Sequence, residues 1–476
     1  MLTDMELMEL ETLLTYKQAH LARTNLWTFN QFMDPKFFTR QKEHCKAIAG
    51  IMMQMDRKEI MKANIAVSPR WGKSYTVSHG CAWMIGRHPE GAIMRNSYGA
   101  DIAHAMSYDV RAIVQKPRYQ LVFPEIKISK NSSALDNWRI ESESTRPTYF
   151  GAGVGGALTG KGCSTLACMD DAHKNFEEAM SPTIQEKTFK WWQSTHLSRI
   201  EGAPQLNINT RWCKKDLAGR IQEVDPLDWF DLTIPALTPQ GESACPEISS
   251  TQELLKRKKI LDPFIWEAEY MQNPIDATGV LFSKSELKRF HKEELRTAPE
   301  ASMMVADTAD EGSNFLSAVY FYQYSDDRYY IVDVVYNQEK VELTEPVVAQ
   351  KILDHRTAMA LFESNNGGKQ YARNVTRLAM EQGSRADIGW RPNTKNKETR
   401  ILMKAGYVKE YFYFLDDDDI EPGSDYWRFM EHLTSYNKQG GNKYDDAPDS
   451  VTIAAEFVEM IRESEEGGHH HGTTAR

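Results

Sequence analysis

A short apolar run that leads into a Gly-Lys-Ser tripeptide constrains this chain more than any other stretch. Residues 65–67 predict a buried strand, residues 68–72 a tight loop, and the residues from Lys73 onward a helix. In such a unit the loop N–H groups and the helix N-terminus face an anion, because both carry partial positive charge. The pattern predicts a triphosphate site with Gly72 in the loop, Lys73 on the outer phosphates and Ser74 on Mg²⁺.

The Gly-Lys-Ser tripeptide alone does not identify a triphosphate site, because the usual motif has a glycine where this chain has Val67. Further along, residues 165–169 predict a buried strand that ends in two acids, Asp170 and Asp171. A nucleotide hydrolase needs one carboxylate to hold Mg²⁺ and another to orient or deprotonate the attacking water. We assign the first role to Asp170 and the second, catalytic role to Asp171.

Further polar residues are expected around the same site. Residues 205–209 predict a strand, and Thr210 and Arg211 at its end are candidates to sense the γ-phosphate or to relay its loss. Arg70, inside the loop, is expected to contact phosphates and to act in catalysis. Gln41 follows an aromatic stretch; its amide can read the edge of adenine, or the residue can simply begin a helix. Strands that alternate with helices here predict a parallel sheet, with ligand sites at the carboxyl ends of its strands.

The second half carries acids at the ends of three predicted elements. The candidates are Asp307 and Glu363 at the ends of two apolar strands, and Asp445, Asp446 and Asp449 at the start of a helix. Metal ions about 4 Å apart clamp the attacking and leaving oxygens of a phosphodiester, and carboxylates gathered in space can hold them. The pattern predicts a two-metal phosphodiesterase site. The four consecutive acids at 416–419 are instead expected to form a solvated loop.

Composition sets the broad class. With 476 residues, 41% hydrophobic and 26% charged, the chain is expected to be a soluble protein of two or three domains. It has no apolar run of membrane-spanning length and no basic segment followed by an apolar core at its start, so we expect a cytoplasmic protein that does not engage a membrane. The net charge of −10 argues against a general DNA coat, although it permits a local basic groove.

The predicted elements also divide the chain. We expect a helical segment over 1–60, a phosphate-loop core over 61–275, a linker over 276–300 with a charged helix at 283–295, a second domain over 301–465 and a disordered tail over 466–476. Within the first segment, helices are expected over 5–20 and 41–55, joined by an aromatic-rich connection over 27–41.

The sequence resembles a known family, the large subunit of tailed-bacteriophage terminases, across essentially the whole chain. The similar segments are residues 68–74 (a deviant Walker A), 169–179 (Walker B), 209–220 (the TRW…DLxGR coupling motif) and 443–449 (the closing nuclease motif). Two positions differ: Asp171 stands where the family commonly has Glu, and Tyr444 replaces the customary His. Among the three acids near the closing motif, we favour Asp445 as the metal ligand.

The resemblance implies an additional-strand P-loop ATPase domain with a parallel sheet, followed by an RNase H-like α/β nuclease domain. It implies ATP with Mg²⁺ in the first domain and two Mg²⁺ or Mn²⁺ ions in the second. The implied activity is ATP-driven translocation of viral DNA into a procapsid, with endonucleolytic cleavage of concatemers. The implied partners are double-stranded DNA, the small terminase subunit, the portal of the procapsid and further copies of this chain in a ring. The implied location is the host cytoplasm and, transiently, the portal vertex.

Two other interpretations remain open at this stage. One is a helicase–nuclease of repair or defence, and the other is an ATP-gated DNA-binding scaffold with an inert nuclease half. A trans-acting arginine is also expected on a ring, and the candidates are Arg95, Arg111, Arg139 and Arg146.

Overall fold

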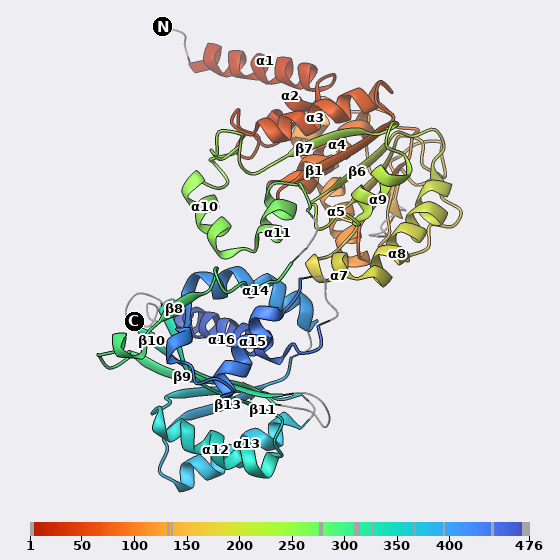
Figure 1. Cartoon of the computed structure of the whole chain (residues 1–476). Coiled ribbons are helices and arrows are strands. Elements are labelled where there is room, and N and C mark those ends of the chain that lie inside the picture. Colours follow the sequence, from red (N-terminus) through yellow and green to blue (C-terminus); the bar gives the residue numbers. More distant parts are fainter. Residues whose placement is uncertain are drawn as a thin grey trace. The chain divides into compact units, whose positions relative to one another are not determined.

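The computed structural model describes residues 4–130, 134, 137–275, 279–308, 315–324, 328–365, 367–393, 396–438 and 442–468. Residues 469–476 of the predicted tail lie outside this range. The chain forms two compact units, Met1–Leu255 with Phe264–Asp276, and Lys256–Pro263 with Ala277–Arg476. Each unit is built on one sheet (Figure 1).

The first unit has a seven-stranded sheet in the order β3-β4-β2-β5-β6-β1-β7. Its strands are β1 (Lys62–Val67), β2 (Ile93–Asn96), β3 (Asn137–Trp138), β4 (Tyr149–Phe150), β5 (Leu166–Asp170), β6 (Gln205–Asn209) and β7 (Phe230–Ile234). Only the β3–β4 pair is antiparallel. Because β6 is inserted between β1 and β5, this is the additional-strand P-loop arrangement, which confirms the predicted fold class of this half.

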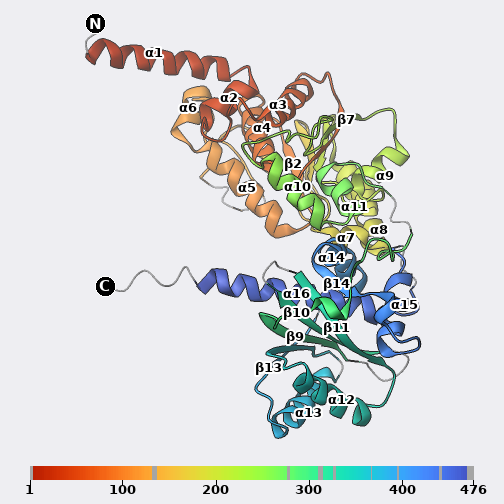
Figure 2. The same ribbon diagram turned by 60° about the vertical axis from the view of Figure 1, so that its left-hand side comes forward.

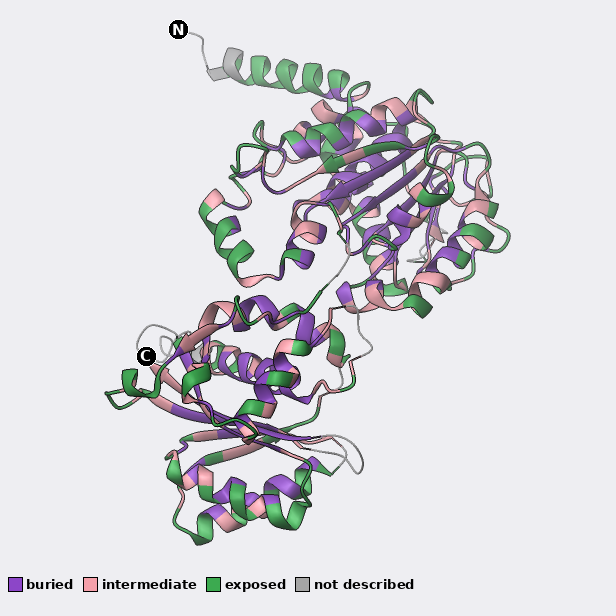
Figure 3. Ribbon diagram, viewed as in Figure 1, coloured by how far each residue is buried: buried purple, intermediate pink, exposed green. Residues whose placement is uncertain are grey.

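Helices surround this sheet, and the strands are the most buried part of the unit (Figure 3). The helices are α1 (Asp4–Ala22), α2 (Leu26–Met33), α3 (Glu43–Asp56), α4 (Lys73–Arg87), α5 (Ala100–Val114), α6 (Pro117–Val122), α7 (Phe176–Met180), α8 (Pro182–Trp191), α9 (Leu217–Val224), α10 (Thr251–Ile260) and α11 (Pro263–Ile265). Helix α2 lies where a connection was expected. Asn25 caps it by accepting from the N–H of Thr28 at 2.9 Å, and Leu26 and Phe29 bury its apolar face.

The second unit has a seven-stranded sheet in the order β13-β12-β9-β10-β11-β14-β8. Its strands are β8 (Lys288–Phe290), β9 (Ala301–Asp307), β10 (Leu316–Tyr324), β11 (Arg328–Asn337), β12 (Met359–Glu363), β13 (Asp387–Arg391) and β14 (Phe412–Leu415). Strands β9, β10 and β11 form an antiparallel meander, and β12 and β13 add in parallel beside β9. This is the RNase H-like order, which confirms the predicted class of the second half.

Helices cover both faces of the second sheet (Figure 2). They are α12 (Val341–Asp354), α13 (Gly368–Glu381), α14 (Lys397–Tyr411), α15 (Asp425–Ser435) and α16 (Asp446–Gly468). Helices α12 and α13 lie on one face, where Val348, Ile352 and Val375 pack against Met304 and Phe362. Helices α14, α15 and α16 lie on the other face. None of the helices in the described residues is both long and apolar enough to cross a membrane.

The charged helix expected at 283–295 is wrong. The segment instead contains β8, which pairs in parallel with β14 at the edge of the sheet, and a short 3-10 turn, Lys292–Glu294. Phe290 is 2% exposed and anchors this edge strand. Its partner strand lies far along the chain, so the local sequence holds no signal for the pairing.

Gly151 provides a test of how tightly the first sheet packs. A Cβ atom at Gly151 would lie 2.0 Å from the carbonyl oxygen of Arg95, which is backbone and cannot move aside easily. We expect Gly151→Ala to lower the free energy of unfolding by about 1–3 kcal/mol. Gly50→Ala is the control, because that Cβ would have no atom within 4 Å and the site is an exposed helical position. There we expect no loss, or a gain of about 0.5–1 kcal/mol. Urea titration of both variants measures the difference, and equal stabilities would contradict the packing described here.

Candidate nucleotide and metal sites

The loop between β1 and α4 has the backbone of a phosphate loop. Arg70 and Gly72 both have a positive φ, +61° and +77°, and Gly72 is the N-cap of α4. A Cβ at Gly72 would meet the ring of Phe37 at 2.5 Å, so only glycine fits the turn and the contact together. Lys73 is the first residue of α4, so the positive end of a 15-residue helix faces the loop.

Lys73 connects the loop with the ends of the two neighbouring strands. Its ammonium lies 3.0 Å from the carboxylate of Asp171 and 3.1 Å from the hydroxyl of Thr210. The same hydroxyl donates to the carbonyl oxygen of Val67 at 3.0 Å. Three segments that are distant in sequence therefore meet at one ammonium group.

Ser74 and Asp170, the pair expected to bind Mg²⁺, are in direct contact, and an arginine holds the carboxylate in place. The Ser74 hydroxyl donates to Oδ1 of Asp170 at 2.9 Å, and the other carboxylate oxygen accepts from Arg95 at 3.1 and 2.5 Å. Arg95 also donates to Ser78 and to the carbonyl of Ser74, both at 2.8 Å. Burial opposes the charge of Arg95, but Asp170 outweighs it, so the pKa of Arg95 lies above its usual value. Hydroxyl and carboxylate oxygens are ligands that Mg²⁺ prefers, so the pair fits this ion.

Arg95 was one of the candidates for a trans-acting arginine, and the structure excludes it from that role. It is 0% exposed and fully engaged with its own chain. Arg146 is exposed and pairs with Glu201, whereas Arg111 and Arg139 are half-buried. The remaining candidates for the trans-acting arginine are Arg111, Arg139 and Arg146.

Asp171 lies beside Asp170 in an unusual backbone conformation, with φ +50°. Its Oδ1 accepts from the N–H of Thr210 at 3.1 Å, while Oδ2 pairs with Lys73. Burial raises the pKa of the Asp171 carboxyl, and Lys73 works against that rise. In this left-handed backbone conformation the side chain lies at the strand ends, between Thr210 and Lys73, and its role toward water remains a prediction.

Arg211, a candidate to sense the γ-phosphate or relay its loss, is held by a carboxylate of its own motif. Its guanidinium pairs with Asp216 at 3.0 and 3.1 Å, and Asp216 is the N-cap of α9, where it accepts from the N–H of Gly219. Arg211 is 8% exposed, so this pair is buried. The arginine therefore ties the end of β6 to α9, and its guanidinium is bound to a carboxylate of its own motif.

The remaining predicted residues of this site lie at its periphery. Arg70 is exposed in the loop. Gln41 is exposed in the turn before α3, next to Lys42, whose ammonium lies 3.6 Å from the centre of the Phe37 ring. The roles of Arg70 and Gln41 toward ATP remain predictions.

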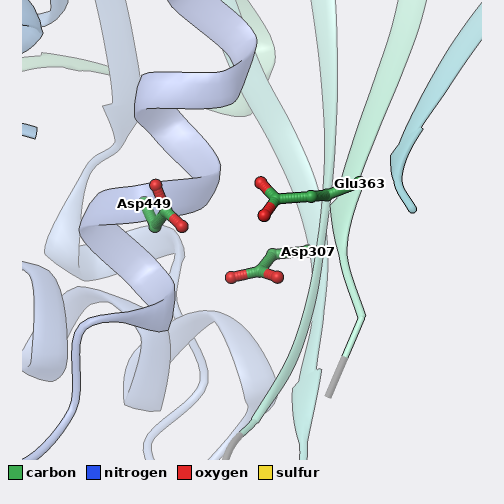
Figure 4. Close-up of side chains that lie close together, drawn as sticks. All are labelled: Asp307, Glu363 and Asp449. Atoms are coloured by element: carbon green, nitrogen blue, oxygen red, sulfur yellow. The ribbon is translucent and has the colours of Figure 1, made fainter. Parts of the chain in front are cut away.

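In the second unit, three carboxylates converge at the ends of two adjacent strands. Asp307 ends β9 and Glu363 ends β12, and the parallel register pairs Ala306 with Phe362, so the two acids are neighbours. Asp449 projects from α16 toward them (Figure 4). One oxygen from each of the three lies within 4.8 Å of the others. Hard oxygen donors at this spacing suit Mg²⁺ or Mn²⁺.

The favoured third ligand, Asp445, is not a member of this group of three. Helix α16 begins at Asp446, and the N–H of Asp449 donates to the carbonyl of Asp445 at 3.0 Å. Asp445 thus lies at the rim, with 38% of its side chain exposed, whereas Asp449 lies inside the first turn at 2%. Asp446 is held by the N–H of Phe315 at 3.0 Å. The sequence shows that Asp445 and Asp449 are four residues apart. It does not show that the helix begins at Asp446, which is why Asp449 points inward and Asp445 lies at the rim.

Two cations of α14 enter this cluster, and our sequence interpretation missed both. The ammonium of Lys397 lies 3.2 Å from Asp307, 2.9 Å from Asp445, 3.4 Å from Asp446 and 3.3 Å from Asp449. Arg400 pairs with Asp449 and, at 3.5 Å, with Glu363. Their three-residue spacing puts both on one helix face, which is the only local signal that they act together.

The two cations do not neutralise the five carboxylates. Burial raises the pKa of Asp307 well above its ordinary value, Lys397 opposes this rise, and the carboxylates of Asp449 and Glu363 add to it. Burial also raises the pKa of Glu363, and Asp449 contributes. A cavity of about 290 Å³ is lined by Glu363, Arg400, Lys404 and Glu459, and its lining includes neither Asp307 nor Asp449. The excess of carboxylates over cations in the cluster fits a divalent cation.

Comparison with solved structures finds similar proteins. The large terminase of the thermophilic bacteriophage D6E has a TM-score of 0.49 at 12% identity, covering 89% of this chain and 98% of that one. The large terminase ATPase domain of Thermus phage P74-26, a mutant, has a TM-score of 0.34 at 13% identity and covers 47% of this chain and 93% of that one. The Mn-soaked, inhibitor-bound human cytomegalovirus terminase nuclease domain has a TM-score of 0.30 at 10% identity and covers 38% and 95%. No family model and no curated protein matches. The solved structures similar to this chain thus include a large terminase and, separately, terminase ATPase and nuclease domains.

Thr210 allows a test of the nucleotide site. We expect Thr210→Val to lower the rate of ATP hydrolysis about tenfold or more, because a hydrogen bond to a charged group contributes roughly 1.5–3 kcal/mol. Thr210→Ser keeps the hydroxyl and should retain most of the activity. Steady-state phosphate release measures both variants, and equal rates would show that the contact between Thr210 and Lys73 has no part in turnover.

The third metal ligand can be identified by substitution. We expect Asp449→Asn to weaken Mn²⁺ binding by at least about tenfold, since a residue that supports the metal contributes that much or more. Asp445→Asn should have a smaller effect, because this residue lies at the rim. Calorimetric Mn²⁺ titration compares the two, with thermal unfolding as the check on folding. A larger loss in the Asp445 variant would restore the original assignment.

Proposed function

We propose that this chain is a DNA-packaging enzyme of the large-terminase type. In this proposal ATP hydrolysis in the first unit drives viral double-stranded DNA into a procapsid, and the second unit cuts concatemeric DNA. One observation carries it: a single chain bears a triphosphate-type constellation at the strand ends of one sheet and a metal-type constellation at the strand ends of another. Three of the sequence motifs that resemble terminases lie at the ends of β1, β5 and β6, and the fourth, residues 443–449, lies at the start of α16.

For ATP, the loop N–H groups and the start of α4 would bind the phosphates, and Lys73 would reach the outer ones. Arg70 would add a further phosphate contact, and Gln41 would contact the adenine. Ser74 and Asp170 would hold Mg²⁺, which supplies neutralisation of charge on the phosphate oxygens.

Hydrolysis would use water oriented by Asp171, whose side chain is fixed by the N–H of Thr210. Asp170 is tied to Arg95 and cannot readily rotate to take this role. The division of labour between the two adjacent acids therefore follows from their partners.

The end of β6 offers a mechanical link from phosphate to helix. Thr210 contacts Lys73, and the next residue, Arg211, holds Asp216 at the start of α9. A change in the position of Lys73 on loss of the γ-phosphate would reach α9 through two consecutive residues. We propose this as the route by which hydrolysis moves DNA.

For cleavage, Asp307, Glu363 and Asp449 would hold Mg²⁺ or Mn²⁺, which would activate water and stabilise the leaving oxygen. Asp445 and Asp446 lie next to this group, in contact with Lys397, and would complete the surroundings of a second ion. Asn365 donates to Oε1 of Glu363 at 2.9 Å and keeps that carboxylate turned toward the site.

Several partners follow from the proposal. DNA contacts would be mainly to phosphates and would weaken steeply with salt. Site choice would fall to a small terminase subunit, and docking to the portal of the procapsid, where copies of this chain would form a ring. The protein would act in the host cytoplasm and, transiently, at the portal vertex.

Two substitutions separate the two activities. We expect Lys73→Ala to lower ATP hydrolysis at least about a hundredfold, because it removes a charged group from the developing phosphate charge. This variant should still cut plasmid DNA in Mn²⁺. Asp307→Asn should show the reverse, with cutting lost and ATP hydrolysis kept. Phosphate release and agarose gels measure the two activities.

The same assays address the other interpretations. Absence of nicking by the unmodified protein in Mn²⁺, with DNA binding retained, would support a scaffold with an inert second unit. Strand separation on forked DNA without a portal would support a helicase–nuclease. Loss of both activities in Lys73→Ala would contradict the assignment of one activity to each unit.

A further inference from the structure

Lys397 contacts four carboxylates, whereas an ordinary ion pair has one. Its ammonium lies within 3.4 Å of Asp307, Asp445, Asp446 and Asp449. An ammonium group has three N–H donors, so four carboxylates share three hydrogens. The ammonium group therefore lies among the carboxylates, as a bound cation would.

The helix that carries Lys397 does not favour this position. Lys397 is the first residue of α14, after the N-cap Asn396, and a cation at a helix N-terminus is repelled by the helix dipole. The carboxylates alone hold the ammonium there. Arg400, one turn later, differs: 4% of its side chain is exposed, and it is clamped to Asp449 and Glu363. The lysine side chain is 32% exposed and has a flexible four-carbon stem.

Lys397 contacts two of the three acids that converge on the candidate metal position. Its ammonium lies 3.2 Å from Oδ2 of Asp307 and 3.3 Å from Oδ2 of Asp449, and its shortest contact, 2.9 Å, is to Oδ1 of Asp445. The ammonium also contacts Oδ1 of Asp446. A divalent ion binds carboxylate oxygens at about 2.0–2.6 Å. Like charges at such short range repel strongly, so ion and ammonium compete for one set of oxygens.

We propose that Lys397 is an internal counter-ion that competes with divalent cations for these carboxylates and must move outward when the ions bind. The proposal rests on the metal site of the proposed function. The protein without metal is then stabilised by its own lysine. In this proposal, an ion that approaches Asp445 and Asp446 must displace the ammonium, so this ion binds more weakly than one that does not.

Metal binding by the full chain tests this competition. We expect Lys397→Gln to bind Mn²⁺ about tenfold more tightly than the unmodified protein, because a competing charge is gone. Lys397→Arg keeps the charge and should stay close to the unmodified affinity. Lys404→Gln is the matched control, because Lys404 lies on the same helix and pairs with Glu459, outside the carboxylate cluster. Its effect should stay within about twofold. Calorimetry, or the electron paramagnetic resonance of free Mn²⁺, gives the affinities. Unchanged or weaker binding in Lys397→Gln would overturn the proposal.

A second measurement uses the unmodified protein and does not depend on whether a variant folds. Amine acetylation followed by mass spectrometry reports how accessible Lys397 is, with Lys404 as the internal reference. We expect the labelling of Lys397 to rise several-fold when Mn²⁺ is added, as the ammonium leaves the carboxylates. Constant or reduced labelling at saturating Mn²⁺ would refute the displacement. Neither readout involves DNA cleavage, so a protein that binds Mn²⁺ but does not cut would contradict the nuclease assignment and leave this inference standing.

Discussion

The buried ion pair between Arg95 and Asp170 is the interaction on which the geometry of the candidate nucleotide site depends. Both side chains are 0% exposed, and removing one partner of such a pair typically costs about 3–5 kcal/mol. The arginine takes one carboxylate oxygen and leaves the other to Ser74, so it decides which way the acid faces. It also binds the carbonyl of Ser74 in the first turn of α4. Strand β2, strand β5 and the phosphate-loop helix are joined at a single guanidinium.

The candidate metal site of the second unit also consists of buried acids that need counter-charge, but its acids are only partly neutralised. Acids that folding gathers at strand ends must find counter-charge, and here α14 supplies it through Lys397 and Arg400. In the first unit the cation is fully enclosed, and the acid has one fixed role. In the second unit the acids outnumber the cations, so the cluster keeps an affinity for further positive charge.

Much of this arrangement was predictable from the sequence, because it depends on where buried strands end. The strands that lead to Asp170, Asp307 and Glu363 were all recognisable as apolar runs followed by acids, and the fold class of both halves followed. The inward acid of α16 was not, because the sequence did not show that the helix begins after Asp445, which leaves Asp445 at the rim and Asp449 in the first turn. Strand β8 and the partners of Lys397 depend on contacts between distant segments, which carry no local pattern.

The register of β9 and β12 has a consequence for folding. Side chains alternate between the two faces of a strand, so a slip of one residue would turn Glu363 to the face opposite Asp307. Phe362 is buried on the face of β12 that packs against α12 and α13, so the same slip would carry the Glu363 carboxylate into this apolar core. Burying an unpaired charge there is costly. The packing of Phe362 therefore also fixes the spacing between the carboxylates of Asp307 and Glu363.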